Sequence, residues 1–284
     1  MATADNGNAQ PQSALIFLGT GCSSAVPNAL CLIRPDPPCT VCSQSLTVPP
    51  EENPNYRCNT SLLIDYCKDN GEQKYILIDV GKTFREQVLR VVHCYRIPQV
   101  DSVLSQNLCF ERNSQYAALS LVQPFSPTND IDPTPVYLSQ YSMDSIVHKF
   151  PYLVQKKLKE GQEIRRVAQL DWQIIENDCG KPFVASGLEF VPLPETYYPL
   201  TLFELHSAIL ERIDIYKNGS HNVHLCLTQT LEALKMLCPK RALLIGMTHE
   251  FDHHKDNEFL VEWSRREGIA VQLAHDGLRV PVDL

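Results

Sequence analysis

Three cysteines in a proline-rich stretch near the start of the chain have the residue type and spacing of metal ligands. Cys39 and Cys42 form a Cys-x-x-Cys pair, and Cys31 precedes them. This spacing lets two thiolates reach one zinc ion tetrahedrally at about 2.3 Å. A redox role is disfavoured, because the pair does not open a helix after a strand. The cysteines therefore predict a zinc site.

Histidines near the C-terminus form a second group of candidates. Residues 248–254 read Thr-His-Glu-Phe-Asp-His-His, which contributes His249, His253 and His254. Imidazoles bind metal tightly only where several donors converge, so a solvated loop or adventitious metal binding are the alternatives.

Short apolar segments of the sequence predict the strands and helices that position these cysteines and histidines. Strands are predicted at 14–18, 61–65, 75–79, 135–139, 172–176, 188–193, 241–246 and 269–274, and helices at 84–95, 225–237 and 257–266. The second and third strands should form a hairpin. Residues 19–59 predict a long loop, which is uncommon in a compact domain unless it is functional. The pattern is an α/β signature, with a flexible segment at 1–13 and a single domain at 14–284.

Composition restricts the partners. The formal net charge is −8, with 25 basic and 33 acidic side chains, which argues against a strong nucleic-acid surface. No secretory signal and no bilayer-spanning run is predicted, so we expect a cytoplasmic protein with no membrane partner. The eleven cysteines should then be free thiols or metal ligands rather than disulfides.

Three short motifs carry a family resemblance. Residues 18–23 read Leu-Gly-Thr-Gly-Cys-Ser, residues 78–81 read Ile-Asp-Val-Gly, and Thr248-His249 follows a predicted strand. In this order they resemble the metallo-β-lactamase superfamily, closest to the branch of the phosphonate-pathway cyclic phosphodiesterase and, further off, tRNA 3′-processing endonucleases. The resemblance implies a four-layered αβ/βα sandwich with a two-metal hydrolytic site at one edge of its sheets.

The central motif of that family is missing. A His-x-His-x-Asp-His segment should follow the strand at 100–104, where this chain reads Ser-Gln-Asn-Leu-Cys-Phe at 105–110. The later His and bridging Asp of the family have no match between 194 and 222 either. We therefore expect an incomplete sandwich with a truncated active site, lower stability, and an opened sheet edge.

The resemblance assigns roles to the residues that remain. His249 matches the last catalytic metal ligand, Asp79 the acid that braces the motif loop, and His224 or His221 a mobile catalytic histidine. It also implies a structural zinc held by Cys31, Cys39, Cys42 and His253, with His254 as a replacement for His253. A second divalent ion, zinc or manganese, would belong to the residual catalytic site.

Two functions follow. The family is one of metal-dependent hydrolases acting on phosphodiesters, and a small phosphodiester would be the substrate if this chain is active. Because losing most ligands removes both the metal and its activated water, we expect hydrolysis to be lost or impaired. The alternative is a non-catalytic, zinc-stabilised isoform or interaction protein of the same fold. A homodimer is left open.

Overall fold

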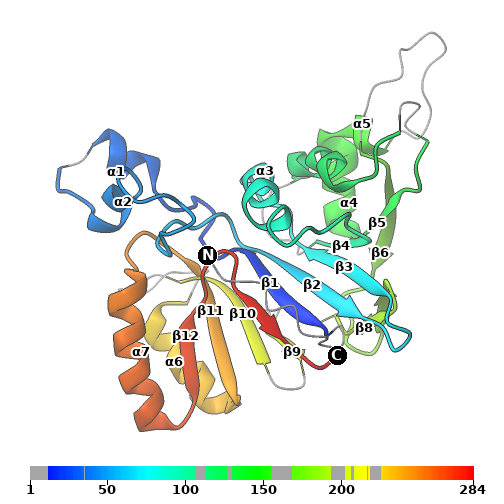
Figure 1. Cartoon of the computed structure of the whole chain (residues 1–284). Coiled ribbons are helices and arrows are strands. Elements are labelled where there is room, and N and C mark those ends of the chain that lie inside the picture. Colours follow the sequence, from blue (N-terminus) through cyan, green and yellow to red (C-terminus); the bar gives the residue numbers. More distant parts are fainter. Residues whose placement is uncertain are drawn as a thin grey trace.

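The computed structural model describes most of the chain. It covers residues 12–34, 36–105, 113–126, 130–154, 168–192, 202–205, 208–215, 217 and 225–284. Two β-sheets lie face to face, and helices cover their outer sides (Figure 1). Within the described ranges, every helix is too short or too polar to span a lipid bilayer.

The first sheet has seven strands in the order β13-β1-β2-β3-β4-β5-β6. Its strands are β1 (Ala14–Gly19), β2 (Ser61–Cys67), β3 (Gln73–Ile78), β4 (Ser102–Leu104), β5 (Thr134–Ser139), β6 (Leu170–Ile175) and β13 (Arg279–Pro281). Pairing is antiparallel from β13 to β3 and parallel from β3 to β6. The predicted hairpin is confirmed, with Leu63 opposite Leu77.

The second sheet has four described strands in the order β12-β11-β10-β9. They are β9 (Leu202–Leu205), β10 (Ala208–Ile215), β11 (Arg241–Met247) and β12 (Ala270–Leu273), and a separate hairpin joins β7 (Phe183–Ala185) to β8 (Leu188–Phe190). Strands β10, β11 and β12 are parallel. Their carboxyl ends therefore meet at one edge, where the candidate ligands follow β11.

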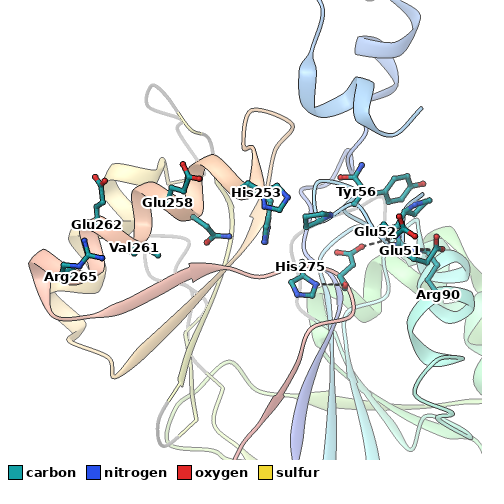
Figure 2. Close-up of a pocket in the computed structure, with 16 residues that line it drawn as sticks. Glu51, Glu52, Tyr56, Arg90, His253, Glu258, Val261, Glu262, Arg265 and His275 are labelled. Carbon is teal, nitrogen blue, oxygen red and sulfur yellow. Dashed lines mark hydrogen bonds and ion pairs between the residues drawn. The ribbon is translucent and has the colours of Figure 1, made fainter. Parts of the chain in front are cut away.

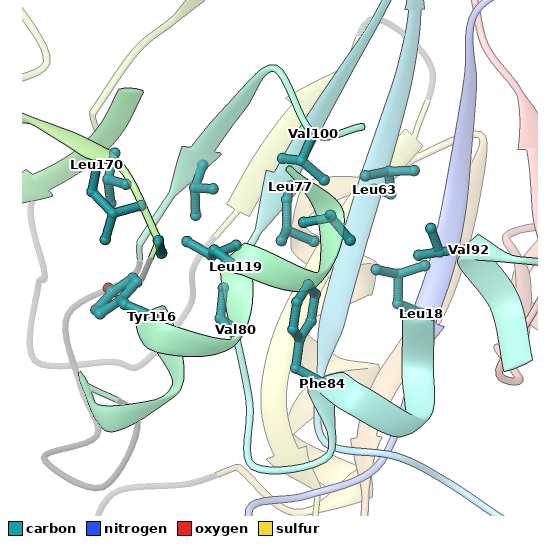
Figure 3. Close-up of a cluster of buried hydrophobic side chains, with 14 of the residues drawn as sticks. Leu18, Leu63, Leu77, Val80, Phe84, Val92, Val100, Tyr116, Leu119 and Leu170 are labelled. Carbon is teal, nitrogen blue, oxygen red and sulfur yellow. The ribbon is translucent and has the colours of Figure 1, made fainter. Parts of the chain in front are cut away.

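Helices form the outer layers. On the first sheet these are α3 (Phe84–Gln87), η1 (Val88–Val92), η2 (Asn113–Val122), α4 (Gln140–Lys149) and α5 (Pro151–Val154), and on the second α6 (Leu227–Leu237) and α7 (His253–Glu267). Figure 3 shows how Phe84 and Leu119 pack with Leu63 and Leu77 beneath the first helical layer. Trp263 and Leu244 belong to the corresponding core under α6 and α7.

A third apolar cluster joins the two sheets. It brings Leu15 and Phe17 of β1 together with Leu243 and Ile245 of β11. Successive residues of a strand face opposite sides, so Ile16 and Leu18 of β1 instead reach the helical layer. Strands β1 and β11 are thus buried on both faces, and the layers form the predicted four-layered αβ/βα sandwich.

Two predictions about local structure need correction. The loop predicted at 19–59 contains two short helices, α1 (Ala29–Ile33) and α2 (Thr40–Gln44), which form a lobe beside the sandwich (Figure 1). Helix α7 begins at His253 rather than at 257, because the Asp252 side chain accepts hydrogen bonds from the backbone of His254 and Lys255. Because α7 starts at His253, His253 and His254 lie in its first turn, whereas His249 lies in the turn before it.

Candidate metal centre

Three cysteines and one histidine converge where the lobe meets the second sheet. The ligand atoms of Cys31, Cys39, Cys42 and His249 all lie within 4.8 Å of one another. Nδ1 of His249 is 3.5 Å from Sγ of both Cys31 and Cys39. Three sulfurs and one imidazole nitrogen suit a tetrahedral zinc ion, so this cluster could hold a metal.

The two short helices position the thiols. Asn28 caps α1 through its side-chain oxygen, 2.9 Å from the Leu30 nitrogen, and Cys31 follows in the first turn. Cys39 is the N-cap of α2, where its sulfur accepts a hydrogen bond from the Cys42 nitrogen at 3.5 Å. The Asn28 backbone nitrogen donates to the Cys42 sulfur at 3.3 Å. Both sulfurs therefore receive a backbone donor, which stabilises a thiolate, although burial outweighs this effect at Cys42.

The thiols differ in acidity. Burial opposes ionisation of Cys39, but hydrogen bonds from His249 and the Cys42 backbone lower its pKa to about 7. Burial and the neighbouring Cys39 raise the pKa of Cys42 to about 12. Metal binding requires deprotonated sulfur, so an ion at this cluster would displace the proton that Cys42 otherwise keeps.

Arg57 supports the turn that carries His249. Its guanidinium is fully buried and donates to the carbonyls of Thr248, at 3.3 Å, and Phe251, at 3.1 Å. A further hydrogen bond of 3.0 Å joins it to Oδ1 of Asn55. Because Thr248 and Phe251 flank His249, Arg57 fixes the backbone on both sides of this ligand. Nothing in the sequence around Arg57 signals this role.

The structure thus groups His249, and not His253, with the cysteines. His249 was predicted as the last ligand of a hydrolytic centre, and His253 as the fourth ligand of the zinc site. His253 begins α7, and its backbone nitrogen is held by Oδ1 of Asn55 at 2.7 Å. Its ring lies beside His254 and His275, with ring centroids 5.7 and 5.9 Å away.

Asp79 lies at the edge where the resemblance expects hydrolytic metals. Its side chain is buried, its backbone has φ 61°, and its nitrogen donates to the Leu104 carbonyl at 2.9 Å. Asp79 therefore directly follows β3, beside the end of β4, and the bracing role stays a prediction. The segments 106–112 and 193–201, and the predicted catalytic residues His221 and His224, lie outside the described residues.

A pocket of about 830 Å³ opens between α7 and residues 50–56 (Figure 2). His253, His254 and His275 line it, together with Arg90 and Asp276. Asp79 and the three clustered cysteines are not among its described lining residues. The pocket is therefore separate from the thiol cluster and from Asp79, although it contains His253, which was predicted as a zinc ligand.

Asp276 lines this pocket and is held there by several hydrogen bonds. Its carboxylate accepts hydrogen bonds from the nitrogen and hydroxyl of Thr20, at 2.8 and 2.9 Å, and from the Cys58 nitrogen at 2.7 Å. Burial raises the pKa of Asp276, although these hydrogen bonds and the charge of Arg90 act to lower it. Asp276 ties the turn after β12 to the end of β1. Sequence reasoning missed it, although its Asp-Gly step marks a turn.

His253 is electrically neutral in this setting. Burial, followed by the charge of nearby Arg57, lowers the pKa of His253 to about 4. Its ring therefore carries a lone pair near neutral pH, as a metal ligand must.

Comparison with solved structures identifies the same architecture in other proteins. A diphosphatase of the PhnP family superposes with a TM-score of 0.68 at 21% identity, over 96% of this chain and 99% of that chain. Zinc-bound PqqB from Methylobacterium extorquens gives 0.60 at 13% identity, over 95% and 100%. YhfI from Bacillus subtilis, a metallo-β-lactamase fold protein, gives 0.59 at 12% identity, over 95% and 99%.

These similarities establish the metallo-β-lactamase fold for this chain. No protein-family model matches the sequence, and no curated protein sequence resembles it significantly. The family resemblance of the short motifs is thus supported at the level of fold.

Proposed function

We propose that this chain is a zinc-stabilised protein of the metallo-β-lactamase fold whose hydrolytic activity is lost or impaired. The observation that carries the proposal is the position of His249, which lies with three thiols. Three thiolates and one imidazole make a closed tetrahedral set, typical of structural zinc. Such a set leaves no position for a reacting water.

The sequence supports the same conclusion independently. Two-metal hydrolysis needs several His and carboxylate ligands that hold ions about 3.5–4 Å apart. The chain has nine histidines, and residues 105–110 contain none of them. His249 was the only imidazole ligand predicted for the hydrolytic edge, and it lies in the thiol cluster. Of the residues predicted for that edge, Asp79 therefore remains without an imidazole ligand beside it.

The zinc would act as a cross-link in the fold. It would join the lobe formed by α1 and α2 to the turn after β11, and 218 sequence positions separate Cys31 from His249. Constraining so long a loop lowers the entropy of the unfolded chain, and binding free energy at such a site contributes directly to folding. The lobe is therefore expected to depend on the ion.

Metal content tests the zinc site. Cys42→Ser should lose one zinc ion per chain relative to the unsubstituted protein, because serine is a poor zinc ligand. Cys94→Ser, which changes an exposed cysteine, is the matched control and should lose none. Equal zinc in the Cys42→Ser and control proteins would rule out the cluster as the site.

Activity tests the loss of hydrolysis. The purified zinc-loaded protein should not cleave bis(p-nitrophenyl) phosphate above the rate of the same buffer and metal without protein. Turnover that disappears in Asp79→Asn, a variant expected to keep the zinc of the thiol cluster, would show a working hydrolytic centre and overturn the proposal.

The second candidate function is a metal-dependent phosphodiesterase. The similarity to the PhnP-family diphosphatase favours it. In this case His224 or His221 would assist the leaving group, and a second divalent ion, zinc or manganese, would bind near Asp79. Activity dependent on His224 and on added manganese would support this candidate over the first.

A further inference from the structure

Three histidines from two separate elements gather in the pocket beside α7. His253 and His254 open α7, and His275 lies in the turn between β12 and β13 (Figure 2). The ring of His253 lies between the other two, nearly perpendicular to each, at 86° and 79°. None of the three belongs to the thiol cluster.

His275 is oriented as a ligand would be. Its Nδ1 lies 3.1 Å from the backbone carbonyl of Asp276. A carbonyl oxygen can only accept, so Nδ1 carries the proton and Nε2 keeps its lone pair. Metal-binding histidines are commonly fixed in this way, with one nitrogen donating to a backbone carbonyl and the other free to coordinate.

His253 has a nitrogen without a partner. Its Nδ1 is buried and makes no hydrogen bond with any described residue. The backbone of His253 is held in place, because its nitrogen donates to Oδ1 of Asn55. A buried polar atom that lacks a protein partner needs an explanation, and an ion as its partner supplies one.

The pocket also has the charge of a cation site. Five acidic side chains line it, against the two arginines Arg90 and Arg265. Arg90 is already within 4 Å of carboxylates of Glu51, Glu86 and Asp276. Glu258 lies one helical turn after His254, a spacing that places both on the same face of α7. The net negative charge of the lining residues favours binding of a cation over binding of an anion.

We propose that His253, His254 and His275 bind a divalent transition-metal ion such as zinc, cobalt or nickel, which links the start of α7 to the β12–β13 turn. Metal–imidazole bonds of about 2.0–2.1 Å place the centroids of two rings on one ion roughly 5–6 Å apart, close to the two separations observed here. Imidazole donors suit these ions better than magnesium or calcium. The nitrogens of the three rings do not all lie within 4.8 Å of one another, as the ligand atoms of the thiol cluster do, so the exposed His254 side chain would have to turn onto the ion.

Cobalt titration distinguishes this site from the thiol cluster. Thiolate ligands give cobalt an intense near-ultraviolet charge-transfer band, whereas an imidazole site gives only weaker visible bands. The full-length metal-free protein should bind two cobalt ions, of which only one produces the thiolate band. The proposals for the two sites can thus be confirmed or contradicted independently.

Substitutions assign the second ion. His275→Ala should bind one cobalt ion fewer than the unsubstituted protein and keep the full thiolate band. His148→Ala, which removes an exposed histidine on α4, is the control and should still bind two. Circular dichroism verifies that His275→Ala is folded, and His254→Gln provides a surface variant with the same expected loss. Saturation of the unsubstituted protein at one cobalt ion, or no loss in either variant, would overturn the proposal.

Discussion

Arg57 shows how a single buried side chain can determine the geometry of a candidate metal centre. It is fully buried and bonded to the backbone on both sides of His249. Hydrogen bonds to charged groups contribute more than neutral ones, and the carbonyls that they satisfy become costly if left unpaired. The placement of His249 among the thiols therefore depends on a residue that is not itself a ligand.

Substitution of Arg57 should damage both stability and metal binding. We expect Arg57→Ala to lower the free energy of unfolding by at least about 3 kcal/mol, because two buried carbonyls lose their donors. Cobalt titration should show a weaker thiolate band at equal ion concentration. The control is Arg34→Ala, an exposed substitution in the same lobe, which should change neither quantity. Unchanged cobalt affinity in folded Arg57→Ala would contradict the role.

His253 predicts an acid-sensitive stability. Its pKa is lowered from 6.5 to about 4 in the folded protein, so between these values the unfolded chain binds more protons. Its contribution is complete above pH 6.5 and disappears as the pH falls through about 4. Because the side chain is only partly buried, solvent screening reduces the effect. Thermal melts of metal-free protein should show a shallower loss between pH 6.5 and 4 in His253→Gln, and an identical slope would contradict this account.

At the scale of elements, the start of α7 separates the two groups of histidines. The Asp252 side chain accepts hydrogen bonds from His254 and Lys255, which begins the helix at His253. His249 stays in the preceding turn near the thiols, while His253 and His254 face the pocket. One capping residue thus assigns neighbouring histidines to different sites.

Loss of this cap should therefore have a measurable cost. We expect Asp252→Ala to destabilise the protein by about 1 kcal/mol, and Asp252→Asn, which keeps the capping oxygen, to change stability much less. For a chain of this size the alanine variant should melt roughly 2–4 °C lower. Equal melting temperatures for the two variants would show that the cap does not define the helix start.

The helical layer over the first sheet gives a test of packing. Phe84 is fully buried among Leu18, Leu63, Leu77 and Leu119 (Figure 3). Phe84→Ala should cost about 3–5 kcal/mol through lost burial and the cavity left behind. Chemical denaturation measures this loss, with Leu89→Ala on an exposed position of η1 as the control.

At the scale of the whole molecule, much of the sandwich was predictable. Apolar runs such as 14–18 and 75–79 are bounded by turn residues and buried on both faces, so their strand character follows from local pattern. The short helices α1 and α2 were missed, because each has five residues and depends on caps and tertiary contacts rather than on periodicity.

The metal site was predictable only in part. The Cys-x-x-Cys spacing indicates the thiols, but no local pattern chooses between His249 and His253, since that choice depends on Arg57 and on the Asp252 cap. His275 and Asp276 enter the pocket through the β12–β13 turn, a tertiary contact that sequence separation conceals. The expected opening of a sheet edge stays a prediction, because residues 193–201 and 218–224 lie outside the described ranges.

The ligand set of the proposed zinc ion tests the central claim most directly. X-ray absorption at the zinc edge should be measured on protein loaded with one equivalent of zinc, at which the thiol cluster should fill first. The account predicts three sulfur neighbours at about 2.3 Å and one nitrogen neighbour at about 2.0 Å. The nitrogen should be lost or replaced in His249→Ala and retained in His253→Ala. A shell of nitrogen and oxygen alone would contradict the account.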